Sequence, residues 1–157
     1  MPRAFRIAKR KYSLNKSMML SGRGALLYGG RWNSPGRAVV YTSQSLSLAT
    51  LELVVHLNAA EKIMAYRRMA LEIPDDLVLP LCRADLPTDW DAMQVEPKAA
   101  QSWGDAWFDE KISAVLEVPS VVIPSESNYL INPEHPDFDR IQCGPIERHF
   151  VDRRIKG

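Results

Sequence analysis

The apolar helix expected from a cap at Ser45 or Ser47 to about Asn58 constrains the fold of this chain most strongly. Its apolar residues fall on nearly every side, so the rest of the chain has to enclose it. Glu52 is the one carboxylate of this segment, and most of its neighbours three and four positions away are apolar. An unpaired buried carboxylate is costly, so Glu52 is expected to meet a cation or hydrogen-bond donors, or to open onto a cavity.

Two interpretations of Glu52 follow from the pattern. In the structural one, Glu52 forms an internal ion pair, for which Arg31 is the candidate partner. In the functional one, Glu52 is an active-site carboxylate, because costly placements of charge gather at functional sites.

Arg31 follows the glycine pair Gly29-Gly30, which lets the backbone bend where other residues cannot. The arginine fork is suited to two-pronged contact with phosphate or carboxylate. A glycine-rich turn with one arginine is weak support for a site, and a surface arginine is the alternative. A second turn is expected at Asn33-Ser34-Pro35-Gly36.

Residues 38–42 have the β-branched and aromatic content of a buried strand that ends near Tyr41. The Tyr41 ring is interpreted either as core or as a surface on which a flat ligand stacks. Trp32, Trp103 and Trp107 are interpreted as core.

The remaining pattern predicts short strands mixed with a few helices, an α+β fold of mixed small sheets in one domain over residues 1–157. Ser102 and Asp105 are typical of a capping box, so a helix is expected from Ser102 through Leu116. Residues 82–101 are expected to be irregular and to cross the mouth of a pocket. Further strands are expected at 3–12, 64–73, 77–79, 120–123 and 149–155, and ordered loops at 128–133 and 135–138.

The net charge and the motifs argue against several classes of protein. Twenty Lys and Arg residues against 19 Asp and Glu give a net charge of +1, so bulk charge does not favour nucleic-acid binding. Cys82 and Cys143 match no metal-ligand spacing, so no metal is expected. Without a long apolar run or a signal peptide, a cytoplasmic protein is expected. Walker, Rossmann and Gly-x-Ser-x-Gly motifs are absent from the sequence.

The segment from Val118 to Ser127 contains three serines beside proline turns. A hydroxyl of Ser120, Ser125 or Ser127 could bind a phosphate or a ribose, and the pattern leaves the choice between them open.

Taken together, five segments resemble the RES-domain family over nearly the whole chain. They are Gly29-Gly30-Arg31-Trp32-Asn33, Val40-Tyr41-Thr42-Ser43, Glu52 in its apolar helix, Val118-Pro119-Ser120, and Asn128 to Phe138 with its Asn-x-Leu-x-Asn-Pro-x-His-Pro-x-Phe pattern. Members of this family are the toxins of bacterial toxin–antitoxin pairs.

The resemblance implies a fold like that of ADP-ribosyltransferases and an enzyme that depletes NAD by breaking its nicotinamide–ribose bond. It implies Arg31, Glu52 and Ser120 as catalytic residues, and Arg31, Tyr41, Trp32 and Ser125 as contacts to NAD. NAD is then the substrate, and no cofactor is expected. The implied partner is a Xre-type helix-turn-helix antitoxin that blocks the active site, with neither nucleic acid nor membrane bound directly.

Three questions stay open at this stage. The acceptor of ADP-ribose is water, phosphate or a protein side chain, so an ADP-ribosyltransferase that modifies a protein is an alternative. A module that binds NAD or ADP-ribose without turnover is another. The oligomeric state is not indicated.

Overall fold

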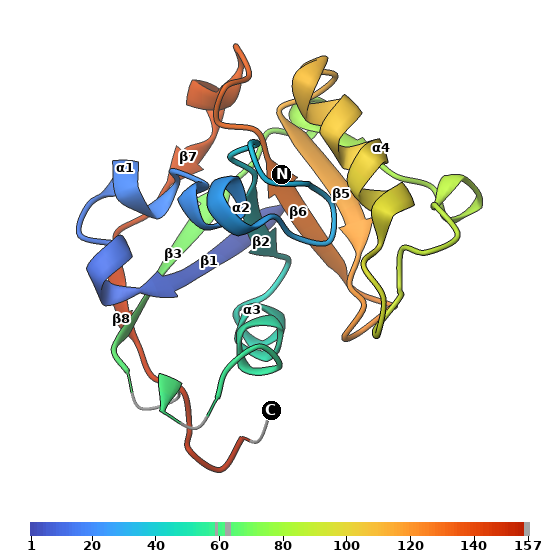
Figure 1. The fold of residues 1–157 in the computed structure, drawn as a ribbon. Coiled ribbons are helices and arrows are strands. Elements are labelled where there is room, and N and C mark those ends of the chain that lie inside the picture. Colours follow the sequence, from blue (N-terminus) through green and yellow to red (C-terminus); the bar gives the residue numbers. More distant parts are fainter. Residues whose placement is uncertain (59, 62–63, 156–157) are drawn as a thin grey trace.

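Eight strands pair into one curled sheet in the computed structural model, which describes residues 1–58, 60–61 and 64–155 (Figure 1). The strands are β1 (Arg3–Lys9), β2 (Val40–Ser43), β3 (Tyr66–Glu72), β4 (Val78–Pro80), β5 (Val115–Pro119), β6 (Ser127–Ile131), β7 (Gln142–Cys143) and β8 (Glu147–His149). The helices are α1 (Lys16–Met19), α2 (Arg23–Tyr28), α3 (Leu46–Val54) and α4 (Lys98–Asp109), with short 3-10 turns at Arg10–Tyr12, Asp75–Leu77, Arg83–Asp85 and Phe138–Arg140.

The strand order is β4-β5-β6-β2-β1-β3-β7, with β8 also paired to β3. Among the described strands, β4 and β5 run parallel and the other pairs are antiparallel. The α+β prediction is therefore confirmed, with the expected small sheets joined into one. β2 lies at the middle of this order, between β6 and β1, so Tyr41 stands near the centre of the sheet.

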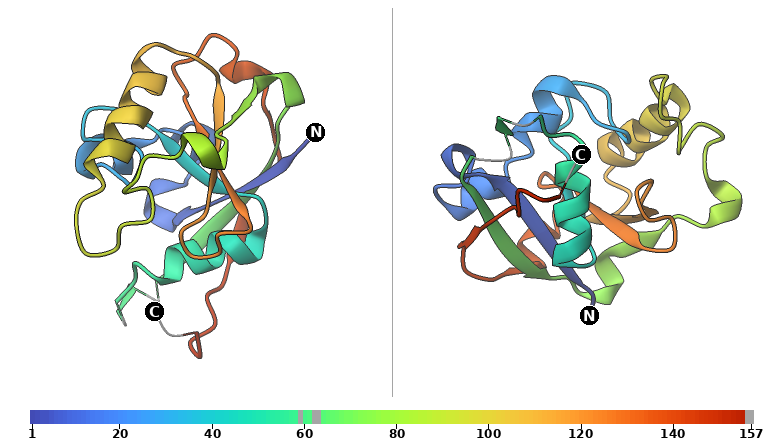
Figure 2. Two further views of the ribbon diagram at one scale, coloured as in Figure 1. Left: turned by 90° about the vertical axis from the view of Figure 1, so that its right-hand side faces the viewer. Right: turned by 90° about the horizontal axis from the view of Figure 1, so that it is seen from below.

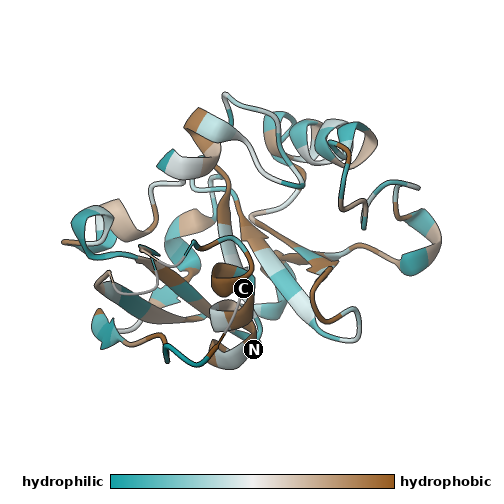
Figure 3. Cartoon of the chain, turned by 60° about the horizontal axis from the view of Figure 1, so that its bottom comes forward, coloured by the Kyte–Doolittle hydropathy of each residue, from teal (hydrophilic) through white to brown (hydrophobic). Residues whose placement is uncertain are grey.

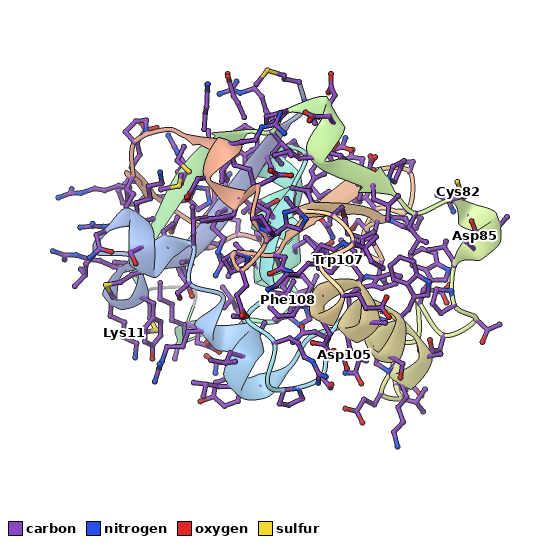
Figure 4. The ribbon with its side chains drawn as sticks, turned by 90° about the horizontal axis from the view of Figure 1, so that it is seen from above. Lys11, Cys82, Asp85, Asp105, Trp107 and Phe108 are labelled. Atoms are coloured by element: carbon purple, nitrogen blue, oxygen red, sulfur yellow. The ribbon has the colours of Figure 1, made fainter. Side chains whose placement is uncertain are left out.

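Two helices cover different parts of the sheet (Figures 1 and 2). α3 contacts β1 and β2, and α4 lies beside β5 and β6. One face of α4 buries Ala100, Gly104, Trp107 and Phe108, a spacing of four, three and one that keeps them on one side. Figure 4 shows Trp107 and Phe108 between this helix and the sheet.

The core lies in three clusters rather than one. The largest packs around Met69, Leu71 and Ile131, the second joins α4 to the sheet, and the third lies under α3. In Figure 3 the brown, apolar colours gather in strands at the middle of the molecule, while much of the periphery is teal.

The helix expected over 102–116 is wrong at both ends. It begins four residues earlier, at Lys98, and ends at Asp109. Lys111 takes φ 50°, and the N–H groups of Lys111 and Ile112 donate to the carbonyls of Phe108 and Trp107. This left-handed turn closes the helix, so Val115 and Leu116 belong to β5 although their spacing continues the helical pattern.

Three further expectations near the C-terminus are wrong. The strand expected at 120–123 is a bend after β5, and the loop expected at 128–133 begins as β6. The last strand was expected over 149–155, but β8 covers Glu147–His149, so only His149 belongs to both. β6 forms because it pairs with β2 on one side and β5 on the other, a tertiary effect that its Asn- and Pro-containing sequence does not reveal.

The earlier elements agree with the sequence pattern within a few residues. β1, β2, β3 and β4 fall within the strands expected at 3–12, 38–42, 64–73 and 77–79, give or take one residue. Ser45 is the cap of α3, since its hydroxyl accepts from Leu48 N at 3.1 Å. The helix is shorter than expected and ends at Val54.

Candidate active site

A cleft of about 730 Å³ opens between α3, the 29–32 turn and the ends of β2, β5 and β6. Arg31, Trp32, Tyr41 and Glu52 all line it, so four of the predicted site residues meet in one place. The segment of residues 92–97 lines its other side, which confirms that the irregular region crosses the mouth of a pocket. The volume is within the range of about 300–1,000 Å³ typical of ligand pockets.

Glu52 is half-buried in this cleft, and its carboxylate is held by hydrogen bonds to neutral groups. Its Oε1 accepts from Ser120 Oγ at 2.6 Å and from Asn128 Nδ2 at 2.8 Å. Among the described residues, no hydrogen bond engages Oε2. The arrangement fixes one oxygen of the carboxylate and leaves the other for a ligand.

Ser120 is fully buried at the end of β5, where it binds Glu52 and organises the next turn. While it donates to Glu52, its Oγ accepts from Val122 N at 3.1 Å and from Ile123 N at 3.0 Å. Its hydroxyl therefore has no proton left to donate to a phosphate, the role considered for it from the sequence. Ser120 is a positioning residue for Glu52.

The other two serines of this loop are placed differently. Ser125 is exposed and is not among the residues that line the cleft. Ser127 begins β6, and its N–H donates to Gln44 Oε1 at 2.7 Å. Of the three serines, Ser120 is therefore the one that contacts Glu52.

Asn128 is a site residue that the sequence reasoning missed. It stands opposite Ser43 in the β2–β6 pair, and Ser43 Oγ donates to its Oδ1 at 2.8 Å. This bond fixes the amide so that Nδ2 points to Glu52. Its sequence gives no sign of this role, because residues 128–133 are typical of a loop and the pairing with β2 is not apparent from them.

Arg31 is held by backbone carbonyls rather than by a carboxylate. Its Nη1 donates to Trp90 O at 3.0 Å and to Ala92 O at 2.7 Å, which fastens the irregular segment across the mouth of the cleft. Within the described part of the chain, no ion pair joins Arg31 to Glu52. The internal ion pair considered for these two residues is therefore not formed.

The turn before Arg31 requires its glycines. Gly29 takes φ 74° and ψ −177°, a conformation essentially restricted to glycine. A Cβ on Gly30 would lie 2.6 Å from Tyr41 Oη, so only glycine permits the approach of this ring. Gly30 N in turn donates to Asn33 O at 2.9 Å, which closes the turn.

Tyr41 lines the cleft but uses its hydroxyl to hold that turn. The hydroxyl donates to Asn33 Oδ1 at 2.6 Å and accepts from Trp32 N at 3.1 Å. Burial raises the pKa of Tyr41 above its usual value, so it stays neutral and keeps donating. Trp32 is itself only 2% exposed, which confirms the interpretation as core, although it also lines the cleft.

α4 holds the turn from outside. Gln101 Nε2 donates to Gly30 O at 3.0 Å, and Asp105 accepts from Ser34 N at 2.9 Å and from Ser34 Oγ. Asp105, labelled in Figure 4, was expected to cap its own helix. The cap is supplied instead by Asp89, which accepts from Ala99 N and Ala100 N at 2.8 and 3.0 Å.

Arg6 is a second cation of the cleft that the sequence reasoning missed. It projects from β1, where Nε donates to Met19 O at 3.3 Å and Nη1 to Tyr41 O at 3.4 Å. Burial lowers its pKa to about 10, so it stays charged at neutral pH. Nothing local marks it, because Arg6 is one of several basic residues in a short basic segment at the start of the chain.

The described residues form no cluster of three or more His, Cys, Asp or Glu side chains that could hold a metal ion. None of the helices described is long and apolar enough to cross a membrane.

Comparisons with known proteins agree on one family. A family model described as the RES domain matches residues 3–152. The "Prs ADP-ribosylating toxin" of Sphingobium sp. (strain YBL2) is 40% identical over 141 residues, which cover 87% of this chain and 86% of the relative. A "Toxin Res" of Yersinia enterocolitica is 36% identical over 153 residues, 97% of this chain and 98% of the relative.

The fold is also similar to a solved structure. A chain in the crystal structure of the M. tuberculosis MbcT–MbcA toxin–antitoxin complex superposes with a TM-score of 0.74. The match covers 95% of this chain and 84% of that chain, at 21% sequence identity. At this identity the likeness concerns the fold alone.

Proposed function

This chain belongs to the RES-domain family, and on that premise we propose that it is a toxin that cleaves the nicotinamide–ribose bond of NAD. The observation that carries the proposal is the Glu52 carboxylate, held in a cleft by Ser120 and Asn128 with one oxygen free. The printed names of the relatives, among them an ADP-ribosylating toxin, support the same chemistry.

The chemistry needs a fixed negative charge beside a ribose. When the bond from C1′ to the pyridinium nitrogen breaks, nicotinamide leaves with the bonding electron pair and becomes neutral. Positive charge then develops on the ribose, as in glycoside hydrolysis. A carboxylate already held in place stabilises that charge without having to reorganise. Glu52 has this property, since both hydrogen bonds to Oε1 come from the central sheet region: from Ser120, directly after β5, and from Asn128 on β6.

The other cleft residues suit the rest of the ligand. Arg31 and Arg6 provide two cations for the pyrophosphate. The ring of Tyr41 provides a flat surface for the nicotinamide, whereas Trp32, predicted as a second contact, is 2% exposed and supports the cleft wall from the core. Ser125 is exposed, in the turn after β5, and does not line the cleft. It can contact NAD only if part of the ligand extends beyond the cleft.

Nicotinamide release from NAD by the purified protein tests the proposal. Wild type is expected to turn NAD over, whereas Glu52→Gln is expected to be about 10²–10³-fold slower. Glutamine keeps an oxygen that can accept from Ser120 and Asn128, so the variant should fold normally. Release at the background rate by the folded wild type would refute the enzymatic claim, and saturable binding with intact NAD recovered would identify a binding module instead.

The acceptor of ADP-ribose decides between subclasses. Attack by water on C1′ gives free ADP-ribose, attack by phosphate gives its phosphate ester, and attack by a protein side chain gives a modified protein. Water, or a side chain with an O–H or N–H group, loses a proton as it attacks, whereas an ionised phosphate oxygen or carboxylate attacks without losing one. The name of the Sphingobium relative favours testing protein transfer beside hydrolysis. Mass spectrometry of the products, with and without inorganic phosphate and cell lysate, separates the three.

A partner antitoxin is the second part of the proposal. Tyr28, Met93 and Val95 line the mouth of the cleft and are 84%, 80% and 69% exposed. Exposed apolar side chains grouped at a cleft support a surface that another protein covers. We expect a Xre-type helix-turn-helix protein encoded beside this chain. Co-purification of that protein, with loss of nicotinamide release on binding, would support the assignment; an unaffected rate in a stable complex would contradict it.

A further inference from the structure

A second cavity, of about 510 Å³, lies at the end of β3 and β8 and is strongly basic. Arg10, Arg67, Arg148 and Arg153 line it, and among the described residues no Asp or Glu lines it. None of these four arginines takes part in an ion pair with another described residue. The cavity shares no lining residue with the cleft that holds Glu52.

The strand register brings two of these charges together. Arg67 on β3 stands directly opposite Arg148 on β8, so both side chains leave the same face of the sheet. Like charges directly opposite each other destabilise a strand pair. Arg67 is partly satisfied, since its Nη1 donates to Ser13 O at 3.4 Å, whereas Arg148 is exposed and has no such bond among the described residues. An anion between them would remove the repulsion.

His149 also lines the cavity, but it follows Arg148 on β8, so its side chain leaves the opposite face of the sheet, toward α3. It is 7% exposed, and its Nε2 lies 3.0 Å from Thr50 Oγ1, whose proton goes to Leu46 O at 2.8 Å. Nε2 therefore carries the ring proton, and Nδ1 is a buried acceptor with no partner among the described residues.

The mouth of the cavity is aromatic. Phe150 follows His149, lines the cavity and is 80% exposed. A base can stack on such a ring, and arginine forks can bind phosphates two-pronged. Four cations, with no acidic residue in the part of the wall that the structure describes, match a ligand with several negative charges better than a single carboxylate.

We propose that this cavity binds a nucleoside polyphosphate, with the phosphates on the arginines and the base on Phe150. The proposal concerns a site separate from the cleft, so it stands independently of NAD cleavage.

Thermal unfolding with ATP as the probe, in magnesium-free buffer, tests the site. The wild-type Tm is expected to rise with ATP, because a ligand that binds only the folded state stabilises it. Arg148→Glu places a carboxylate opposite Arg67, so the Tm of this variant without ATP is expected to exceed that of wild type. The rise in Tm caused by ATP binding in the cavity is expected to vanish in this variant. A lower Tm of Arg148→Glu without ATP would show that Arg148 has a structural role only, and would overturn the proposal.

Amide shifts in NMR locate the binding, because ATP can also enter the cleft through its ADP part. Saturable shifts are expected at Arg148 and Phe150, and the Kd read from them is expected to weaken about tenfold or more in Arg148→Gln. Arg23→Gln, which removes an exposed charge outside both cavities, is the matched control and should leave this Kd unchanged. Shifts confined to the cleft would refute the site.

Two further probes test the class of ligand. Inorganic pyrophosphate is expected to bind more weakly than ATP, and Phe150→Ala is expected to remove that difference. Equal binding of pyrophosphate and ATP by wild type would overturn the assignment of a nucleoside. Tighter binding of a single-stranded oligonucleotide than of ATP would overturn the small-molecule assignment in favour of nucleic acid.

Discussion

The hydrogen bonds around Glu52 show that the three residues predicted as one catalytic set have different contacts. Arg31, Glu52 and Ser120 were predicted as one catalytic set, but Ser120 contacts Glu52 while Arg31 contacts the carbonyls of Trp90 and Ala92. In the proposed reaction Ser120 acts only through Glu52, and Asn128 on β6 donates to the same carboxylate oxygen.

Replacing Ser120 with alanine tests this division at the scale of one residue. Ser120→Ala is expected to slow nicotinamide release about tenfold or more, because Glu52 loses a charge-assisted hydrogen bond that orients it. It is also expected to cost about 1–3 kcal/mol of stability, since the N–H groups of Val122 and Ile123 lose their acceptor. Steady-state kinetics and urea unfolding measure the two effects.

Ser125→Ala is the matched control, since Ser125 is an exposed serine of the same loop. It should change neither the rate nor the stability by a measurable amount. A larger rate loss in Ser125→Ala than in Ser120→Ala would show that Ser125 is the functional serine.

At this scale the sequence predicts residue types better than their bonds. Glu52 stood out because its helix is apolar, and that local signal was sufficient. Asn128 and Arg6 did not stand out, because their importance arises from strand pairing and from burial at the middle of the sheet. Neither property can be read from neighbours along the chain.

At the scale of elements, the close packing of α4 on the turn that contains Arg31 shapes the site. A Cβ on Gly104 would lie 1.7 Å from Trp32 O, so glycine at this position sets the distance between the helix and the turn. Residues 82–101 were predicted as irregular, which is wrong from Lys98 onward, where α4 begins. Before Lys98, side chain–backbone bonds of Asp89 and Arg31 hold the segment in place of a sheet or helix ladder.

Gly104→Ala is therefore expected to destabilise the fold by about 3 kcal/mol or more, because a backbone atom cannot move away as a side chain can. Gly24→Ala makes the same change in α2, where no atom lies within 4 Å of the new Cβ. That variant should gain about 0.5–1 kcal/mol from the helix preference of alanine. Urea unfolding compares the two, and similar stabilities would contradict the packing described.

The contact between α3 and β8 makes stability depend on pH. Burial, and then the charge of Arg68, lower the pKa of His149 below 6.5. Below pH 6.5 the unfolded chain binds a proton that the folded chain does not, so the free energy of unfolding should fall as the pH drops through 6.5 toward the folded pKa. Urea unfolding at pH 7.5 and 5.5 measures the slope.

His149→Gln should reduce this slope, since glutamine can still donate to Thr50 and does not titrate. His56→Gln, at an exposed position, serves as the control and should leave most of the slope in place. A wild-type stability that is constant between the two pH values would contradict the shifted pKa of His149.

At the scale of the whole molecule, the cleft is assembled from distant parts of the chain: Arg6, Arg31, Glu52 and Asn128 come from β1, a turn, α3 and β6. The α+β class was predictable because strands with period two alternate with two apolar helical segments. The joining of all strands in one sheet was not, because strand order depends on long-range pairing.

Such a cleft couples ligand binding to global stability. NAD is expected to raise the Tm of Glu52→Gln, which binds it without consuming it. At a concentration 100-fold above Kd the gain is about 2.7 kcal/mol, or ~5–10 °C for a chain of this size. Differential scanning calorimetry measures the rise, and a Tm that does not respond to saturating NAD would contradict NAD binding in the cleft.

The bonds from Arg31 to Trp90 and Ala92 also have a kinetic consequence. One nitrogen, Nη1, serves both carbonyls, so a pyrophosphate that recruits this nitrogen competes with the segment across the cleft mouth. The bound ligand and the carbonyls of Trp90 and Ala92 then compete for the same Arg31 guanidinium. Ligand entry should therefore loosen the rim, and the amides near Ala92 should exchange with deuterium faster when the substrate is bound than when the cleft is empty.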